Sequence, residues 1–319
     1  MSTQAPAFIR FEPIYQTRVW GGRVLASRFG RELPDRENPY GESWEISARE
    51  EADSEVVGGP LAGKTLRELW SDPELKLLIF GSKAPEGERF PLLCKILDAR
   101  DKLSIQVHPP ASVADELGGE PKTEVWYIAH ADPGAELYVG VEPGIDEAAF
   151  REALEAGTAE KAVHAIPVVT GQHIFIPSGR LHAIGAGLLI YEIQQNSDTT
   201  YRVYDWNRIG LDGKPRDLHV EESLKCIDFS DVTPGMDAAV GNLICECEHF
   251  RLERHALGEG ESLAAITGGR FAIITVVGGA LNAGEEAFVE GDFLIVSASQ
   301  GAELLSAGGG AEVLLTTWP

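Results

Sequence analysis

The sequence predicts an all-β protein of the jelly-roll or barrel class, with small helices inserted between the strands. Three observations indicate this class. The apolar runs are short, and Gly, Pro or Ser residues bound each of them, as is typical of strands. The 35 Gly and 18 Pro residues suit many tight turns. Helical periodicity is confined to a few short segments.

The strands and helices can be assigned in chain order. The clearest strand patterns lie at residues 125–128, 173–176, 188–193, 271–277 and 293–296. Residues 65–80 have helical spacing, but Asp72-Pro73 in the middle predicts two short helices rather than one. Asp146 is a suitable N-cap for another helix. The remaining helices are expected at residues 112–117, 145–156 and 220–227.

Length and composition indicate two domains. A chain of 319 residues is long enough for about two. From Met236 onward, Ala and Gly become frequent and aromatic residues become rare. We therefore expect a larger domain over residues 1–235, with the helical insertions, and a smaller C-terminal β domain over residues 236–319.

Composition and net charge argue against several protein classes. Apolar residues make up 44% of the chain and charged residues 24%, so extensive disorder is excluded. No apolar run approaches the ~18 residues of a membrane span. The N-terminus lacks the basic and apolar regions of a secretory signal, so we expect a cytoplasmic protein. The net charge of −23 argues against a nucleic-acid partner. An anionic ligand would need Lys and Arg gathered at its site.

Two segments suggest a metal site. In the first, Gln106 and His108 share one face of a predicted strand, and both residue types can ligate a metal. The second, residues 171–182, has the spacing G-x5-P-x-G-x2-H, so His182 follows a turn and begins the next strand. Between them, Glu124 heads an apolar strand, where a carboxylate needs a cation. Two imidazoles and two oxygens suit Zn²⁺, with Fe²⁺ or Mn²⁺ as alternatives.

This pattern resembles the paired motifs of the cupin superfamily, although Gln106 stands where a first His is usual and Ala186 where Asn is usual. Within that superfamily, about residues 10–230 resemble the short bacterial form of type I mannose-6-phosphate isomerase. Five motifs in order carry this resemblance: Trp20-Gly21-Gly22, G-E-S-W-E from Gly41, S-I-Q-x-H-P from Ser104, K-x-E from Lys122, and E-I-Q-Q-N-S-D-T-T-Y-R from Glu192 to Arg202.

The resemblance implies cupin jelly-roll barrels and a zinc-dependent isomerase. It implies one Zn²⁺ per chain, bound by Gln106, His108, Glu124 and His182. The implied reaction interconverts mannose 6-phosphate and fructose 6-phosphate through an enediol. It also implies a degenerate second cupin unit without metal ligands, in which three motif positions have lost their usual Pro, Gly and His: Ser297, Ser299 and Ala302.

Three residues are candidates for catalysis. The resemblance assigns this role to Arg202, with a surface ion pair to Asp198 or Asp205 as the alternative. Lys122 shares a strand face with Glu124, so we expect it beside the sugar; a solvated lysine is the alternative. Glu192 is a candidate base near the metal, and a structural ion pair explains it equally well.

Four further residues are candidates for substrate binding. Lys95 lies in an apolar run and needs an anionic partner, for which a phosphate is suitable. Ser104 shares the strand face of Gln106 and is expected to help bind that phosphate. Trp20 is expected to form a pocket wall, with core packing as the alternative. Asp198 is expected to contact substrate and is also a conceivable base.

The isomerase is the leading hypothesis, and two alternatives stay open. One is a non-catalytic sugar-phosphate-binding cupin that acts as a sensor; the presence of Arg202 and Lys122 argues against it. The other is an iron-dependent cupin dioxygenase, which Gln106 in place of a His disfavours. The expected partner is a small phosphosugar, and the expected assembly is a monomer or homodimer.

Overall fold

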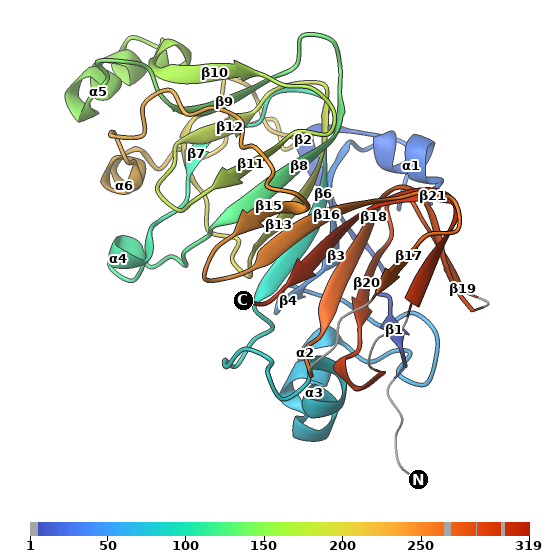
Figure 1. Ribbon diagram of the computed structural model, residues 1–319. Helices are drawn as coiled ribbons and strands as arrows, with labels where there is room; N and C mark the ends of the chain where they lie inside the picture. Colours follow the sequence, from blue (N-terminus) through green and yellow to red (C-terminus); the bar gives the residue numbers. More distant parts are fainter. Residues whose placement is uncertain (1–5, 265–268, 285, 301–303) are drawn as a thin grey trace. The chain divides into compact units, whose positions relative to one another are not determined.

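The computed structural model describes residues 6–264, 269–284, 286–300 and 304–319 (Figure 1). These residues form three larger antiparallel sheets and a two-stranded sheet, with short helices between strands. The predicted all-β class with helical insertions is therefore confirmed. None of the helices in the described ranges is long and apolar enough to cross a membrane.

The chain divides into two compact units that are each discontinuous in sequence. We call Tyr15–Ser43 with Lys95–Asp237 the central unit. The terminal unit contains Met1–Ile14, Trp44–Cys94 and Ala238–Pro319. The last junction lies near the predicted boundary at residue 235, but the terminal unit also takes two segments from the N-terminal part of the chain. The division into 1–235 and 236–319 stays a prediction.

Two sheets have most of their residues in the central unit. The five-stranded sheet has the order β10–β9–β12–β7–β14. Its strands are β7 (Ile105–Val107), β9 (Glu136–Val141), β10 (Val163–Pro167), β12 (His182–Ile184) and β14 (Tyr201–Tyr204). The six-stranded sheet has the order β11–β8–β13–β6–β2–β3. Its strands are β2 (Ile14–Gly22), β3 (Tyr40–Ile46), β6 (Leu92–Ala99), β8 (Glu124–Ala131), β11 (His173–Ile176) and β13 (Leu188–Gln195).

The side-chain alternation of these strands creates the core. Trp126 and Ile128 of β8 belong to one buried cluster with Leu137 and Val139 of β9, so this cluster lies between the two sheets. The intervening Tyr138 belongs to a second cluster, on the opposite face of the five-stranded sheet. On each strand, every second side chain therefore points inward. The same alternation also decides which polar side chains face the interior.

Helical segments cover the other face of the five-stranded sheet. Phe150 of α5 (Glu147–Glu155) and Leu224 of α6 (Val220–Cys226) pack in the second cluster. The 3₁₀ segment Ala159–Ala162 contributes to the same cluster. The central unit also contains α1 (Val24–Phe29) and α4 (Ala111–Ala114).

The terminal unit has its own sheet and core. Its sheet has the order β1–β20–β18–β21–β16–β15, with β17 paired to β21 and β19 paired to β18. Strand β1 pairs with β20 at the register Phe8–Val296. The strands are β1 (Phe8–Ile9), β15 (Leu243–Glu246), β16 (Arg251–Leu257), β17 (Ser262–Ala264), β18 (Ala272–Ala283), β19 (Glu286–Val289), β20 (Phe293–Val296) and β21 (Leu304–Thr317).

Helices α2 (Leu66–Ser71) and α3 (Pro73–Phe80) complete this unit with the short strands β4 (Ala48–Arg49) and β5 (Ala52–Asp53) and the 3₁₀ segment Ala298–Gln300. Phe271 and Phe80 stack edge to face with ring centroids 5.2 Å apart, in a cluster with Trp70 and Phe90. Of the three degenerate motif positions, Ser297 and Ser299 are described here, whereas Ala302 lies outside the described residues.

Most predicted elements are present. The break between α2 and α3 is confirmed, because Asp72 caps α3 by accepting the backbone N–H groups of Glu74 and Leu75. Asp146 caps α5 in the same way, through the N–H of Ala149. The helix expected at 112–117 is wrong at both ends, since only Ala111–Ala114 is helical and turns follow. Helix α1 was not predicted.

A buried carboxylate joins α1 to the six-stranded sheet. The Oδ2 atom of Asp98, on β6, accepts the backbone N–H of Val24 at 2.6 Å. Burial raises the pKa of Asp98 to about 6. The folded state therefore binds this proton more tightly than the unfolded chain does.

This raised pKa predicts a pH-dependent stability. Since the folded pKa of about 6 exceeds the ordinary value of 3.8, the resulting stability is present at low pH and is lost as pH rises through the folded pKa. Relative to Asp98→Asn, the wild type should gain about 2 kcal/mol in free energy of unfolding from about pH 7.5 to about pH 4.5. Urea titrations of both proteins measure this difference. Parallel pH profiles would contradict it.

Candidate active site

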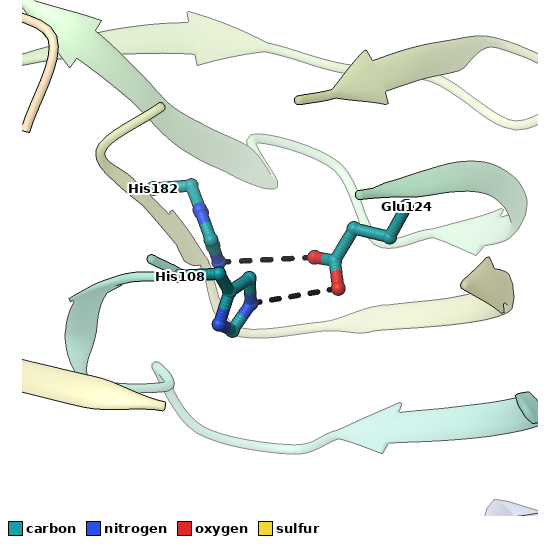
Figure 2. Close-up of side chains that lie close together, drawn as sticks. All are labelled: His108, Glu124 and His182. Carbon is teal, nitrogen blue, oxygen red and sulfur yellow. Dashed lines mark ion pairs between the residues drawn. The ribbon is translucent and has the colours of Figure 1, made fainter. Parts of the chain in front are cut away.

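Three buried side chains converge within the central unit (Figure 2). His108 directly follows β7, Glu124 begins β8 and His182 begins β12, and each is 1% exposed. The Nε2 atom of His108 lies 3.5 Å from one carboxylate oxygen of Glu124, and Nε2 of His182 lies 3.7 Å from the other. The sequence prediction that these three residues meet is therefore confirmed.

The backbone fixes how both imidazoles are oriented. Nδ1 of His108 lies 2.9 Å from the carbonyl oxygen of Thr199, and Nδ1 of His182 lies 2.9 Å from that of Arg180. A carbonyl only accepts, so Nδ1 carries the proton on each ring and Nε2 keeps a lone pair. Burial lowers the pKa of both rings and, for His108, the positive charge of Lys122 lowers it further. Both rings are thus neutral, as metal ligands must be.

The donor atoms of this cluster fit a metal ion. Nε2 of His108 and Oε2 of Glu124 are buried and have no hydrogen-bond partner within the described part of the chain. Such orphaned buried atoms are costly unless a cation binds them. Gln106, the predicted fourth ligand, pairs with His182 in the register of β7 and β12. Its side-chain amide lies 3.3 Å from Nε2 of His182, so rotation of the amide would turn its oxygen toward the same point.

A pocket of about 600 Å³ adjoins this cluster. Gln106 connects the two, because it lines the pocket and touches His182. The pocket wall contains all the other predicted site residues: Trp20, Lys95, Ser104, Lys122, Glu192, Asp198 and Arg202. Trp20 also belongs to the core between the sheets, so both interpretations of its role are compatible with its position.

Charged side chains of both signs share the inner pocket. Nζ of Lys95 lies 3.6 Å from Glu192, 3.8 Å from Glu42 and 3.9 Å from Asp198. Arg18 donates two hydrogen bonds to Glu42, at 2.8 and 3.2 Å. The sequence analysis missed Arg18 and Glu42. Both residues could have been identified from the sequence, because Glu42 stands in the G-E-S-W-E motif and Arg18 shares a strand face with Trp20.

Glu192 and Lys122 are both buried near Glu124, and both have a raised pKa. Oε2 of Glu192 accepts the indole N–H of Trp126 at 2.9 Å. Burial raises the pKa of Glu192, and the nearby charge of Glu124 raises it further. For Lys122, burial lowers the pKa, but the carboxylates outweigh this, Glu124 most of all, and the net shift is upward. Lys122, with Nζ 3.5 Å from Glu124, is therefore an ammonium cation and not a solvated lysine.

Arg202 faces the pocket from β14. Its Nε donates to Oγ of Ser104 at 3.1 Å, and its Nη1 donates to the backbone carbonyl of Asp217 at 3.1 Å. Burial lowers the pKa of Arg202 to about 10, helped by the charge of Arg216. Since Arg202 makes no ion pair in the described ranges, the alternative of a surface pair with Asp198 or Asp205 is wrong.

The chain matches known proteins over most of its length. A family model for the phosphomannose isomerase type I catalytic domain matches residues 8–120. The chain is 44% identical over 230 residues to the probable mannose-6-phosphate isomerase GmuF of Bacillus subtilis, covering 71% of this chain and 70% of that protein. It is 37% identical over 270 residues to mannose-6-phosphate isomerase ManA of the same organism, covering 82% of each.

The chain belongs to the type I phosphomannose isomerase family. The crystal structure of mannose 6-phosphate isomerase from Bacillus subtilis matches this type I phosphomannose isomerase with a TM-score of 0.84 and 30% identity. That match covers 98% of this chain and 99% of the crystallised one. Membership confirms the predicted family, the cupin fold and the enzyme class.

The hydrogen bond between Trp126 and Glu192 predicts a stability difference. Trp126→Phe removes the indole N–H that one buried carboxylate oxygen accepts. Trp20→Phe is a matched control, because the Trp20 ring lies in the same core and makes no hydrogen bond within the described residues. We expect Trp126→Phe to be less stable than Trp20→Phe by about 1.5–3 kcal/mol. Urea unfolding measures both, and equal losses would refute the prediction.

Proposed function

We propose that the protein is a zinc-dependent aldose–ketose isomerase that interconverts mannose 6-phosphate and fructose 6-phosphate through an enediol. One observation carries this proposal: three buried side chains of metal-binding type adjoin a pocket that is lined by both cations and carboxylates. The names of the relatives support the choice of substrate.

The donor set fits one Zn²⁺ per chain. His108, Glu124 and His182 would bind it with Gln106, which gives two nitrogens and two oxygens. The buried Nε2 of His108 and Oε2 of Glu124, which have no hydrogen-bond partner in the described part of the chain, support this assignment. When bound, zinc would supply a Lewis acid for the sugar oxygens next to the reacting carbons.

The side chains around the pocket provide the proton chemistry. The reaction moves one proton from C2 to C1 of the open-chain sugar and a second from the O2 hydroxyl to O1, so that the carbonyl shifts from C1 to C2. We assign this proton transfer to the Glu192 carboxylate, which faces the pocket between Lys95 and Trp126. Lys122 and Arg202 remain cationic and stabilise the negative charge that develops on the sugar oxygens.

The remaining site residues bind the substrate in this proposal. Ser104 and Lys95 contact the phosphate group, Trp20 forms a wall beside the sugar, and Asp198 contacts the sugar hydroxyls. Cytoplasmic location and a monomeric or homodimeric state stay predictions.

Metal removal tests the proposal directly. A coupled assay measures fructose 6-phosphate formed from mannose 6-phosphate by the protein as purified, after chelation and after zinc is restored. We expect turnover to disappear with the chelator and to return with zinc. A folded, zinc-loaded protein without turnover would favour the sensor, and iron content with loss of this activity would favour the dioxygenase.

The ligand assignment has a matched control. His182→Ala should lose zinc and turnover together, because it removes one of two imidazole ligands. His173→Ala removes a histidine that is also buried but lies outside the cluster, so it should keep one zinc per chain. Elemental analysis of both variants measures this. One zinc per chain in the folded His182→Ala variant would exclude His182 as a ligand.

Arg202→Ala should keep zinc and lose about 100-fold in kcat, since the guanidinium interaction belongs to the transition state. Arg202→Lys, which keeps the positive charge, should recover part of this loss. Steady-state kinetics on metal-loaded proteins separates kcat from KM. An increase in KM alone would assign Arg202 to substrate binding instead.

A further inference from the structure

The loop between β13 and β14, residues 196–200, contacts the candidate metal centre through its backbone. The carbonyl oxygen of Thr199 accepts Nδ1–H of His108 at 2.9 Å. This hydrogen bond selects the tautomer that keeps a lone pair on Nε2, the ligating atom. Residues that hold the Thr199 peptide group in place therefore act on the metal site, even where they lie too far away to touch an ion.

Ser197 is one such residue. It is 1% exposed, and its hydroxyl donates to the backbone carbonyl of Glu120 at 3.1 Å and accepts the backbone N–H of Thr199 at 3.2 Å. Thr199 makes a contact in return, because its Oγ1 accepts the backbone N–H of Glu120 at 3.0 Å. The three hydrogen bonds form a closed cycle that joins the 196–200 loop to the segment leading into β8.

Gln194 holds the same loop from the end of β13. It is 0% exposed, and its Nε2 donates to the backbone carbonyls of Gln195 and Ser197, at 2.7 and 2.6 Å. Gln194 also stands directly opposite Glu124 in the register of β13 and β8, so both side chains lie on one face of the sheet. The loop is thus attached to the strand pair that carries one of the candidate metal ligands.

Successive residues of the 196–200 loop have alternating roles. Ser197 and Thr199 make the hydrogen bonds that hold the loop and the His108 ring, whereas Asp198 and Thr200 line the pocket. Ser197 is not part of the pocket lining. A change confined to its hydroxyl therefore reaches His108 through the backbone and removes no atom from the pocket wall.

We propose that Ser197 is a positioning residue of the metal centre. Its hydroxyl holds the Thr199 peptide group, which keeps His108 in the tautomer and orientation that bind the metal, and Gln194 supports the same loop. This inference rests on the proposed function for the identity of the metal, zinc. The hydrogen bonds themselves act on His108 with or without an ion.

A pair of buried serines tests this inference. Ser197→Ala removes both hydrogen bonds of the hydroxyl, and the full chain should then lose about tenfold in zinc affinity, measured by competition with a chromophoric chelator. Ser47→Ala is the matched control. Ser47 is 0% exposed, and its hydroxyl donates to the backbone carbonyl of Ala52 at 2.6 Å in the terminal unit. This control should keep the zinc affinity of the wild type.

The His108 ring provides a second measurement that needs no zinc. Spectra of the metal-free full chain with ¹⁵N-labelled histidine, recorded at one pH, distinguish a proton on Nδ1 from one on Nε2. The wild type should have His108 protonated on Nδ1, because the Thr199 carbonyl accepts there. Ser197→Ala should show a mixture of the two tautomers, and Ser47→Ala should match the wild type.

The outcomes separate this inference from the proposed function. Wild-type zinc affinity in Ser197→Ala, or an unchanged His108 tautomer, would overturn it, and so would an equal loss of affinity in Ser47→Ala. If the wild type binds no zinc, the proposed function fails, while the tautomer comparison still decides this inference. If Ser197→Ala does not fold, Gln194→Met replaces it, since that change removes both donors that hold the loop backbone, and the same outcomes apply.

Discussion

The candidate metal centre depends on two hydrogen bonds that leave the ligating atoms unused. His108 and His182 each donate Nδ1–H to a backbone carbonyl, from Thr199 and Arg180. These bonds select one tautomer and hold each ring, so two Nε2 lone pairs and the Glu124 carboxylate point at one place before any ion binds. Because the carbonyls belong to loops next to β14 and β12, the loops around the barrel position the site as much as the strands do.

The side-chain alternation that places apolar residues in the core also places polar residues in the pocket. On β6, β8 and β13, apolar residues face inward along one part of the strand, and Lys95, Glu124 and Glu192 continue the same face. A buried charge alone would be costly. However, Lys95 and Glu192 lie 3.6 Å apart, and Glu124 lies 3.5 Å from His108 in the candidate metal site. The fold therefore tolerates a polar end of its core because its charges compensate one another.

The sequence predicts local features well and long-range partnerships poorly. The spacing of Gln106 and His108, and the position of Glu124 at a strand start, follow from strand periodicity alone. The caps at Asp72 and Asp146 follow from local hydrogen bonding. The pairs Arg18–Glu42 and Arg216–Asp205 join residues whose proximity depends on tertiary packing, which strand periodicity does not reveal. A composition shift likewise cannot reveal a unit assembled from three separate segments.

The strand at the start of the described chain constrains how the protein can be made. Strand β1 pairs with β20, and Oγ of Ser297 donates to the carbonyl of Pro6 across 291 positions of sequence. During synthesis, β1 stays without its partner until β20, far along the sequence, has been made. The terminal unit therefore cannot fold in the order of translation, while every strand of the five-stranded sheet is complete well before the last segment appears. Among the described strands, β1 is thus made before β20 by nearly the full length of the sequence and can pair only after it.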